Sequence, residues 1–122
     1  GGFQFAVSQF LGQTLSQIER MPETTIDEIV DKYVEMNIAH PFMEGNGRST
    51  RIWLDLMLKR SLKSCVDWSK IDKTAYMEAM RLSVINPTRI RELIANALTD
   101  KINDREMFMK GIDYSYYYEQ DN

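Results

Sequence analysis

Apolar residues recur at three- and four-residue spacing along most of this chain, a period that predicts helices. The clearest case begins at residues 25–28, Thr-Ile-Asp-Glu, which have the form of a capping box. The apolar stripe behind it consists of Ile26, Ile29, Val30, Tyr33, Val34 and Ile38. We expect this helix to run into His40-Pro41 and to stop or bend there, because a proline interrupts helical hydrogen bonding.

A second helix is predicted to start near Asn46, directly after a glycine-rich turn at residues 44–47. Its apolar residues are Ile52, Trp53, Leu54, Leu56, Met57 and Leu58. They lie nearly all round a helix, so the pattern predicts a helix buried at the centre of the fold.

Capping and breaking residues place three more helices. A helix over residues 7–19 should end at Met21-Pro22, because the residue before a proline avoids the helical region. Residues 69–72 fit a capping signal for a helix whose buried face carries Tyr76, Ala79, Met80 and Val84. Asn86-Pro87 should open a further helix that continues through Leu98, since proline suits a first helical turn.

The two ends of the chain differ from its middle. Phe3 and Phe5 alternate with Gln4, which predicts a short strand within residues 1–6. Residues 103–110 should form a helix that stops at Gly111, a residue type common at helix ends. A tyrosine-rich tail then spans residues 112–119. The expected fold class is all-α, with a short strand at the start.

Composition narrows the class of protein. With 122 residues, a net charge of −3, 43% hydrophobic and 27% charged residues, the chain fits one globular domain. This excludes a disordered tail, a coiled rod, a collagen and a disulfide scaffold, and the acidity argues against a general nucleic-acid binder. A single cysteine, Cys65, favours a reducing, cytoplasmic setting. No apolar run approaches the roughly 20 residues that cross a bilayer, so no membrane contact is expected.

Candidate chemistry is concentrated in residues 40–51, His-Pro-Phe-Met-Glu-Gly-Asn-Gly-Arg-Ser-Thr-Arg. Two glycines let the backbone approach a ligand, and the helix that follows presents free N–H groups that attract an anion. Arg48 adds a forked, permanently charged donor, and Arg51 extends the same positive face one turn later.

The same stretch holds a metal ligand and a base. Glu44 offers a hard oxygen of the kind that binds Mg²⁺ beside phosphates. His40 is the one histidine of the chain, and a histidine's ordinary pKa of about 6.5 suits a general base. Taken singly, each feature has a structural explanation as a helix cap, a turn or a solvated face. Their convergence favours a nucleotide site for phosphate-group transfer.

Residues 40–51 resemble the Fic family motif, His-Pro-Phe-x-(Asp/Glu)-Gly-Asn-Gly-Arg-x-x-Arg, at every specified position. The resemblance implies a single Fic domain over residues 1–122, with a helical core, a catalytic loop and helix start at residues 40–51, and an inhibitory helix at residues 112–119. Residues 1–6 would be the remnant of a β-hairpin, the flap. An upstream helix and the first flap strand would then be missing.

The resemblance implies transfer of AMP from ATP to a Tyr, Thr or Ser hydroxyl of a target protein. His40 would take the proton from that hydroxyl, and Glu44 would hold Mg²⁺ against the phosphates. The phosphate chain would be bound through Gly45, Asn46, Gly47, Arg48 and Arg51, with Arg51 at the γ-phosphate. The target segment would pair with the flap through Gly2, Phe3, Gln4 and Phe5.

Branches of this family that catalyse different reactions differ at single positions of the motif. The Doc branch, which phosphorylates its target, typically has lysine where Gly47 stands, so this chain favours AMP transfer. A phosphocholine-transferring branch stays open, and so do a hydrolase that removes AMP at the same site and a binding module without catalysis. By analogy with bacterial relatives, the target would be a subunit of a type II topoisomerase. Self-association is also compatible with the resemblance, and no direct contact with nucleic acid is expected.

The tail resembles the family's inhibitory motif, (Ser/Thr)-x-x-x-Glu-(Gly/Asn), with Ser115 and Glu119 in the defining positions. It implies that Glu119 occupies Arg51 and excludes the γ-phosphate. Gln120 departs from the motif, which affects how the helix ends rather than the charge of Glu119. Tyr116 and Tyr117 are candidates for self-AMPylation, which would unseat the helix by bulk and charge.

Overall fold

The computed structural model describes residues 16–39 and 47–119, and for residues 47–49 and 119 it describes the backbone alone. Three predictions fall outside the described residues: the strand at residues 1–6, the first part of the helix over residues 7–19, and the part of the predicted catalytic loop at residues 40–46. Residues 16–19 are helical, and the backbone turns at Arg20 before Pro22. The predicted end of that helix is therefore confirmed.

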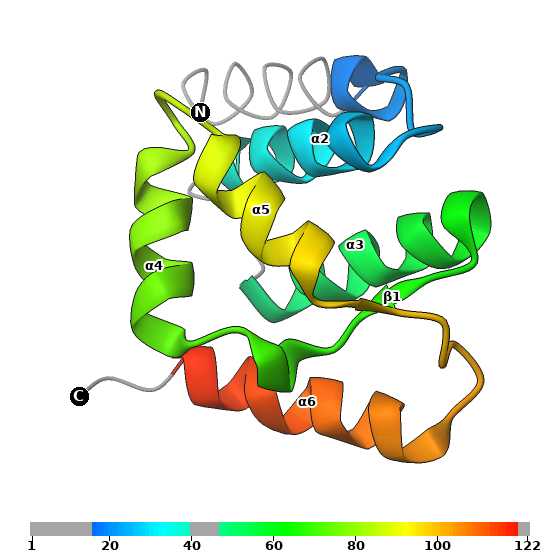
Figure 1. Ribbon diagram of the computed structural model, residues 1–122. Coiled ribbons are helices and arrows are strands. Elements are labelled where there is room, and N and C mark those ends of the chain that lie inside the picture. The colour runs from blue at the N-terminus through cyan, green and yellow to red at the C-terminus, as the bar shows by residue number, and fades with distance from the viewer. Residues whose placement is uncertain (1–15, 40–46, 120–122) are drawn as a thin grey trace, which may run out of the picture.

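Helices stacked side by side make up the described fold (Figure 1). Helix α3 (Gly47–Leu62) lies between α2 (Ile26–Ala39) and α6 (Arg105–Glu119) and contacts both of them. Helix α5 (Thr88–Asn96) packs on α2 and on α4 (Lys73–Leu82), and the end of α6 lies beside the start of α4. The all-α fold class is confirmed.

The capping box predicted for α2 is present. The backbone N–H of Glu28 donates to Thr25 Oγ1 over 3.2 Å, and the N–H of Thr25 donates to Glu28 Oε1 over 3.0 Å. The Thr24 hydroxyl also donates to Glu28 Oε1, and these bonds hold the pKa of the Glu28 carboxyl below its usual range. The first turn of α2 thus satisfies donors that a helix start leaves unpaired.

The core forms where α2, α3 and α5 meet. The side chains with no exposed surface include Ile29, Val30, Tyr33, Leu54, Met57, Leu58, Ile90 and Ile94. Helix α3 is central as predicted, but one of its apolar faces is not buried. Ile52 is 58% exposed and Leu56 is 52% exposed, because this face of α3 lines an open pocket beside α6.

The segment between α3 and α4 carries a short strand and a 3₁₀ turn that the sequence patterns did not predict. Strand β1 (Cys65–Val66) pairs antiparallel with β2 (Leu98–Thr99), with Cys65 opposite Thr99. The turn η2 (Trp68–Lys70) follows, capped by Asp67. Because Leu98 pairs in β2, α5 ends at Asn96 and not at Leu98 as predicted.

Helix α4 begins at Lys73, with Asp72 as its cap: the Asp72 carboxylate accepts from the N–H of Ala75 over 3.0 Å. Tyr76 and Ala79 are buried, which confirms the predicted face. Val84 lies beyond the end of the helix and is 66% exposed, so its predicted place on the buried face is wrong.

Helix α6 continues without a break from Arg105 to Glu119, so the prediction of a helix end at Gly111 is wrong. Gly111 has no left-handed backbone angle. It lies against the indole of Trp68, and a Cβ atom built there would lie 3.7 Å from Trp68 Cδ1. The two helices predicted over residues 103–110 and 112–119 are therefore parts of one continuous helix, α6.

Replacing Gly111 with alanine is expected to raise the free energy of unfolding by about 0.5–1 kcal/mol. Alanine is the better residue in a helix interior, and the added methyl group makes an ordinary van der Waals contact. Urea unfolding followed by circular dichroism measures the change. A loss of stability would indicate that Gly111 ends a helix, as the sequence pattern suggested.

None of the helices within residues 16–39 and 47–119 combines the length and the apolar character that crossing a lipid bilayer requires.

Candidate functional site

The predicted site residues divide into three groups. His40, Glu44, Gly45 and Asn46 lie outside the described residues, as does the predicted flap at residues 2–5. Gly47 and Arg48 form the start of α3 and Glu119 ends α6, in each case described by the backbone alone. Arg51, Ser115, Tyr116 and Tyr117 are described with their side chains.

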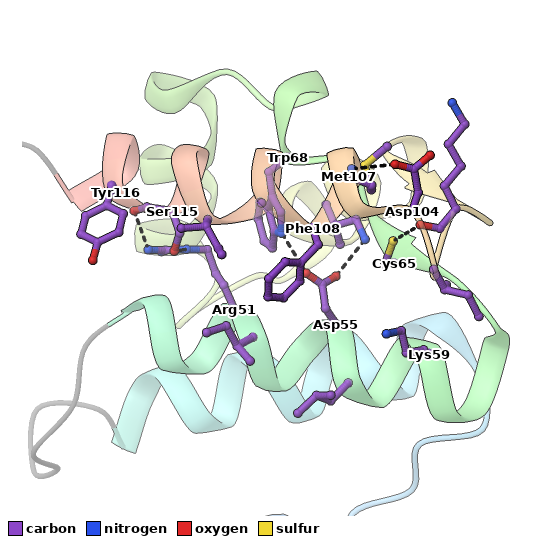
Figure 2. A pocket seen from close by; sticks show the side chains of 17 residues that line it. Arg51, Asp55, Lys59, Cys65, Trp68, Asp104, Met107, Phe108, Ser115 and Tyr116 are labelled. Carbon is purple, nitrogen blue, oxygen red and sulfur yellow. Dashed lines mark hydrogen bonds between the residues drawn. The ribbon is translucent and has the colours of Figure 1, made fainter.

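Arg51 and Ser115 meet across the interface of α3 and α6, although 64 positions separate them. The Arg51 Nε–H donates to Ser115 Oγ over 2.9 Å, and Nη2–H donates to the Ser115 carbonyl oxygen over 3.1 Å. Arg51 is 5% exposed and Ser115 is 7% exposed. The guanidinium, drawn in Figure 2 with its dashed bonds to Ser115, is therefore engaged by α6 and almost closed to solvent.

Aromatic rings surround the rest of the Arg51 guanidinium. Its central carbon lies 5.7 Å from the centre of the Tyr76 ring and 5.5 Å from that of Tyr118. Its Nη1–H donates to the Tyr76 hydroxyl over 3.3 Å, and that hydroxyl bonds to the hydroxyl of Tyr33. Contacts of this kind with aromatic rings stabilise the positive charge of Arg51. Burial raises the pKa of the Tyr33 hydroxyl well above its usual value, so this hydroxyl keeps its proton. We name this arrangement the arginine cage: Arg51 with Tyr76, Tyr118 and Ser115.

A pocket of about 410 Å³ lies between α3 and α6 and begins at Arg51 (Figure 2). Its apolar lining includes Ile52, Leu56, Trp68, Phe108 and Ile112. The exposed face of α3 thus forms one wall and α6 the other, with Lys59 at the end remote from Arg51.

Asp55 is the residue in this region that sequence reasoning missed. It lies one helical turn after Arg51, and its Oδ1 accepts from the N–H of Val66 over 2.8 Å. Its Oδ2 accepts from the indole N–H of Trp68 over 3.1 Å. Burial raises the pKa of Asp55 to about 6, because the charged form loses water that the two hydrogen bonds do not fully replace. The available signal was a lone carboxylate within the apolar run from residue 52 to residue 58.

The raised pKa of Asp55 makes part of the stability pH-dependent. Because the folded-state pKa of about 6 lies above the ordinary value of 3.8, the folded protein binds this proton more tightly than the unfolded chain. The contribution is therefore fully present below about pH 4 and is lost as the pH rises through 6. We expect the loss of this contribution between about pH 4 and pH 7.5 to lower the free energy of unfolding by up to roughly 3 kcal/mol.

Urea unfolding of the wild type and of Asp55→Asn at pH 4 and pH 7.5 checks this expectation. The asparagine variant cannot titrate at this position, so the difference in unfolding free energy between the two proteins isolates Asp55. A difference that stays constant with pH would contradict the assignment.

The two tyrosines predicted as self-modification sites both reach solvent. Tyr116 is 56% exposed and Tyr117 is 44% exposed, whereas Tyr118 on the same turn is 3% exposed. Exposure meets one requirement of modification, and self-AMPylation stays a prediction.

Among the described residues no cluster of three or more His, Cys, Asp or Glu side chains forms a metal site. The predicted ligand Glu44 lies outside the described residues. The predicted Mg²⁺ site therefore stays a prediction.

Comparison with known families gives one match that bears on this site. The sequence model of the Fic/DOC family matches residues 3–58. The matched range includes residues 40–51 and extends through the part of α3 that carries Arg51 and Asp55.

Proposed function

We propose, because this chain belongs to the Fic/DOC family, that it is a protein adenylyltransferase held inactive by its own C-terminal helix. Members of this family are known for AMPylation-type transfer to hydroxyl groups. The substrates would be ATP and a Tyr, Thr or Ser side chain of a target protein.

The proposed reaction is one displacement at phosphorus. His40 accepts the proton of the target hydroxyl, whose oxygen forms a bond to the α-phosphorus of ATP. The bond from that phosphorus to the bridging oxygen breaks, and pyrophosphate leaves with the electron pair. The protein contributes mainly positioning and charge stabilisation, as is usual in phosphoryl transfer.

The start of α3 supports the phosphate-binding half of this proposal. The helix begins at Gly47, so the N–H groups of its first turn have no partners within the helix and attract an anion. Arg48 is the second residue of this turn. The carboxylate of Glu44 has the hard oxygen chemistry that suits Mg²⁺, an ion that would neutralise phosphate charge when bound.

The observation that carries the inhibitory half is the double hydrogen bond from Arg51 to Ser115. Arg51 is the arginine proposed to bind the γ-phosphate, and the same guanidinium is engaged by α6 in a nearly closed cage. A phosphate group competes for these donors, so productive ATP binding requires α6 to release Arg51.

Glu119 adds to this arrangement by its position. It follows Ser115 by four residues on the same helix, which places both residues on one face. We infer that the Glu119 carboxylate reinforces the hold on Arg51, as the resemblance to the inhibitory motif implies.

Replacing Glu119 with glycine tests the proposal. We expect AMP transfer to rise about ten- to hundredfold, the range that corresponds to losing one hydrogen bond to a charged group. The measurement uses ATP labelled on its α-phosphate, incubated with Mg²⁺ and a cell lysate, and mass spectrometry then identifies the labelled target. Glu106→Gly is the matched control, because Glu106 is an exposed glutamate in the first turn of α6, at the end remote from Arg51.

Each outcome has a defined meaning. Labelling by Glu119→Gly above that of wild type and of Glu106→Gly supports an inhibited transferase. Equal labelling by wild type and Glu119→Gly contradicts the inhibitory role, and no labelling by either contradicts the transferase. Removal of AMP from a labelled target by the wild type would instead favour the hydrolase.

A further inference from the structure

Among the described side chains in the last turn of α6, Tyr118 is the most deeply buried. It is 3% exposed, and its hydroxyl lies 2.7 Å from the carbonyl oxygens of both Trp68 and Ile71, to which it donates. Its ring stacks on Tyr76 at 4.9 Å and meets Trp68 edge-on at 5.9 Å. These contacts attach the end of α6 to the η2 turn and to α4.

The η2 turn is in turn attached to α3. The Trp68 indole N–H donates to Asp55, one helical turn after Arg51 on the same helix. Arg51 itself donates to Ser115, which precedes Tyr118 by three residues on α6. Residues three or four apart share a helix face, so α6 is held to one face of α3 at two points. One point is the direct Arg51–Ser115 contact, and the other runs from Tyr118 through Trp68 to Asp55.

We propose that Tyr118 is a positioning residue for inhibition, and that its hydroxyl fixes the last turn of α6 on η2 so that Ser115 and Glu119 remain at Arg51. This inference rests on the proposed inhibitory function of α6. In this proposal, the carbonyl oxygens of Trp68 and Ile71 anchor the inhibitory helix by accepting from the Tyr118 hydroxyl.

The hydroxyl can be separated from the ring. Tyr118→Phe keeps the stacking on Tyr76 and the edge contact with Trp68, and removes the donor that serves two carbonyl oxygens. The Trp68 carbonyl oxygen still accepts from the Ile71 N–H over 3.2 Å. The substitution therefore weakens the attachment of the last turn without opening a cavity.

We expect Tyr118→Phe to raise AMP transfer about three- to tenfold over wild type, the effect of one net hydrogen bond on the fraction of molecules with Arg51 released. In the Glu119→Gly background the same substitution should add little, because the expected activation of that variant already leaves most molecules with Arg51 released. Tyr114→Phe is the matched control, since it removes a hydroxyl from a half-buried tyrosine of the same helix that is neither part of the arginine cage nor a candidate for self-AMPylation. Hydrogen exchange of the amides at residues 115–118 provides a second readout. We expect this exchange to accelerate in Tyr118→Phe and to stay unchanged in the control variant.

The outcomes separate this inference from the proposed function. Activation by Tyr118→Phe with no further gain in the double variant supports the anchor. Unchanged or lower transfer by Tyr118→Phe, with Glu119→Gly active, overturns the anchor and leaves the inhibited transferase standing. Activation that multiplies with that of Glu119→Gly also overturns it, because the hydroxyl would then act elsewhere. If neither variant gains activity, the inhibitory function fails and the anchor fails with it.

Discussion

Replacing His40 with alanine in the Glu119→Gly background is expected to lower AMP transfer by about 10²–10⁴-fold, the range that a positioned general base supplies. The Glu119→Gly background is needed because it removes the proposed inhibition, so that the chemical step becomes measurable. His40 directly follows the last residue of α2, and α3 starts seven positions after it, at Gly47. In the sequence, His40 is therefore close to the residues proposed to bind phosphate, which begin at Gly45.

The control for His40→Ala is nucleotide binding, measured by titration with a fluorescent ATP analogue. We expect the dissociation constant to change little, because the phosphates are assigned to the turn and to the arginines. Transfer within tenfold of the background would contradict the role of His40 as the base. A loss of both binding and transfer would point to a structural role.

Replacing Trp68 with alanine is expected to lower the free energy of unfolding by about 3–5 kcal/mol, the usual cost of removing a buried aromatic side chain. Trp68 is 2% exposed and packs edge-on against Tyr76 and Tyr118. Its indole N–H also donates to the half-buried Asp55 carboxylate, so alanine leaves that group one partner short.

Urea unfolding followed by circular dichroism measures the change, with Trp53→Ala as the matched control. Trp53 is half-buried at the edge of the core, so its removal should cost less. If Trp68→Ala lowers the free energy of unfolding no more than Trp53→Ala does, the role of Trp68 as a main packing residue of the core is contradicted.

Local sequence signals predicted the parts of the fold that depend on local contacts. The capping box of α2 is complete within four residues, and its bonds form as the pattern indicates. The strand pair was missed because Cys65 and Thr99 are each part of a two-residue strand whose partner is remote in sequence. The end of α6 was misplaced for a related reason: Gly111 marks close packing against Trp68, and a glycine looks the same in sequence whichever role it has.

The candidate site divides in the same way. Arg51 was identified from a local motif, and its contact with Ser115 was implied through a family resemblance rather than through spacing. The cage around it requires Tyr76 and Tyr118, which come from two further helices, so nothing local connects them. The assignments for His40, Glu44 and the flap remain predictions of the sequence, and the His40→Ala experiment above tests the first of them.

The uninterrupted course of α6 limits how the proposed inhibition could be relieved. With no proline or left-handed residue between Arg105 and Ser115, the helix has no hinge that would let its end swing while its beginning stays seated. Arg51 can then be freed by unwinding of α6 from Ser115 to its end, or by detachment of the whole helix from α3. Fraying needs only the short terminal segment to unwind, which makes the last turn the natural target for any activating signal.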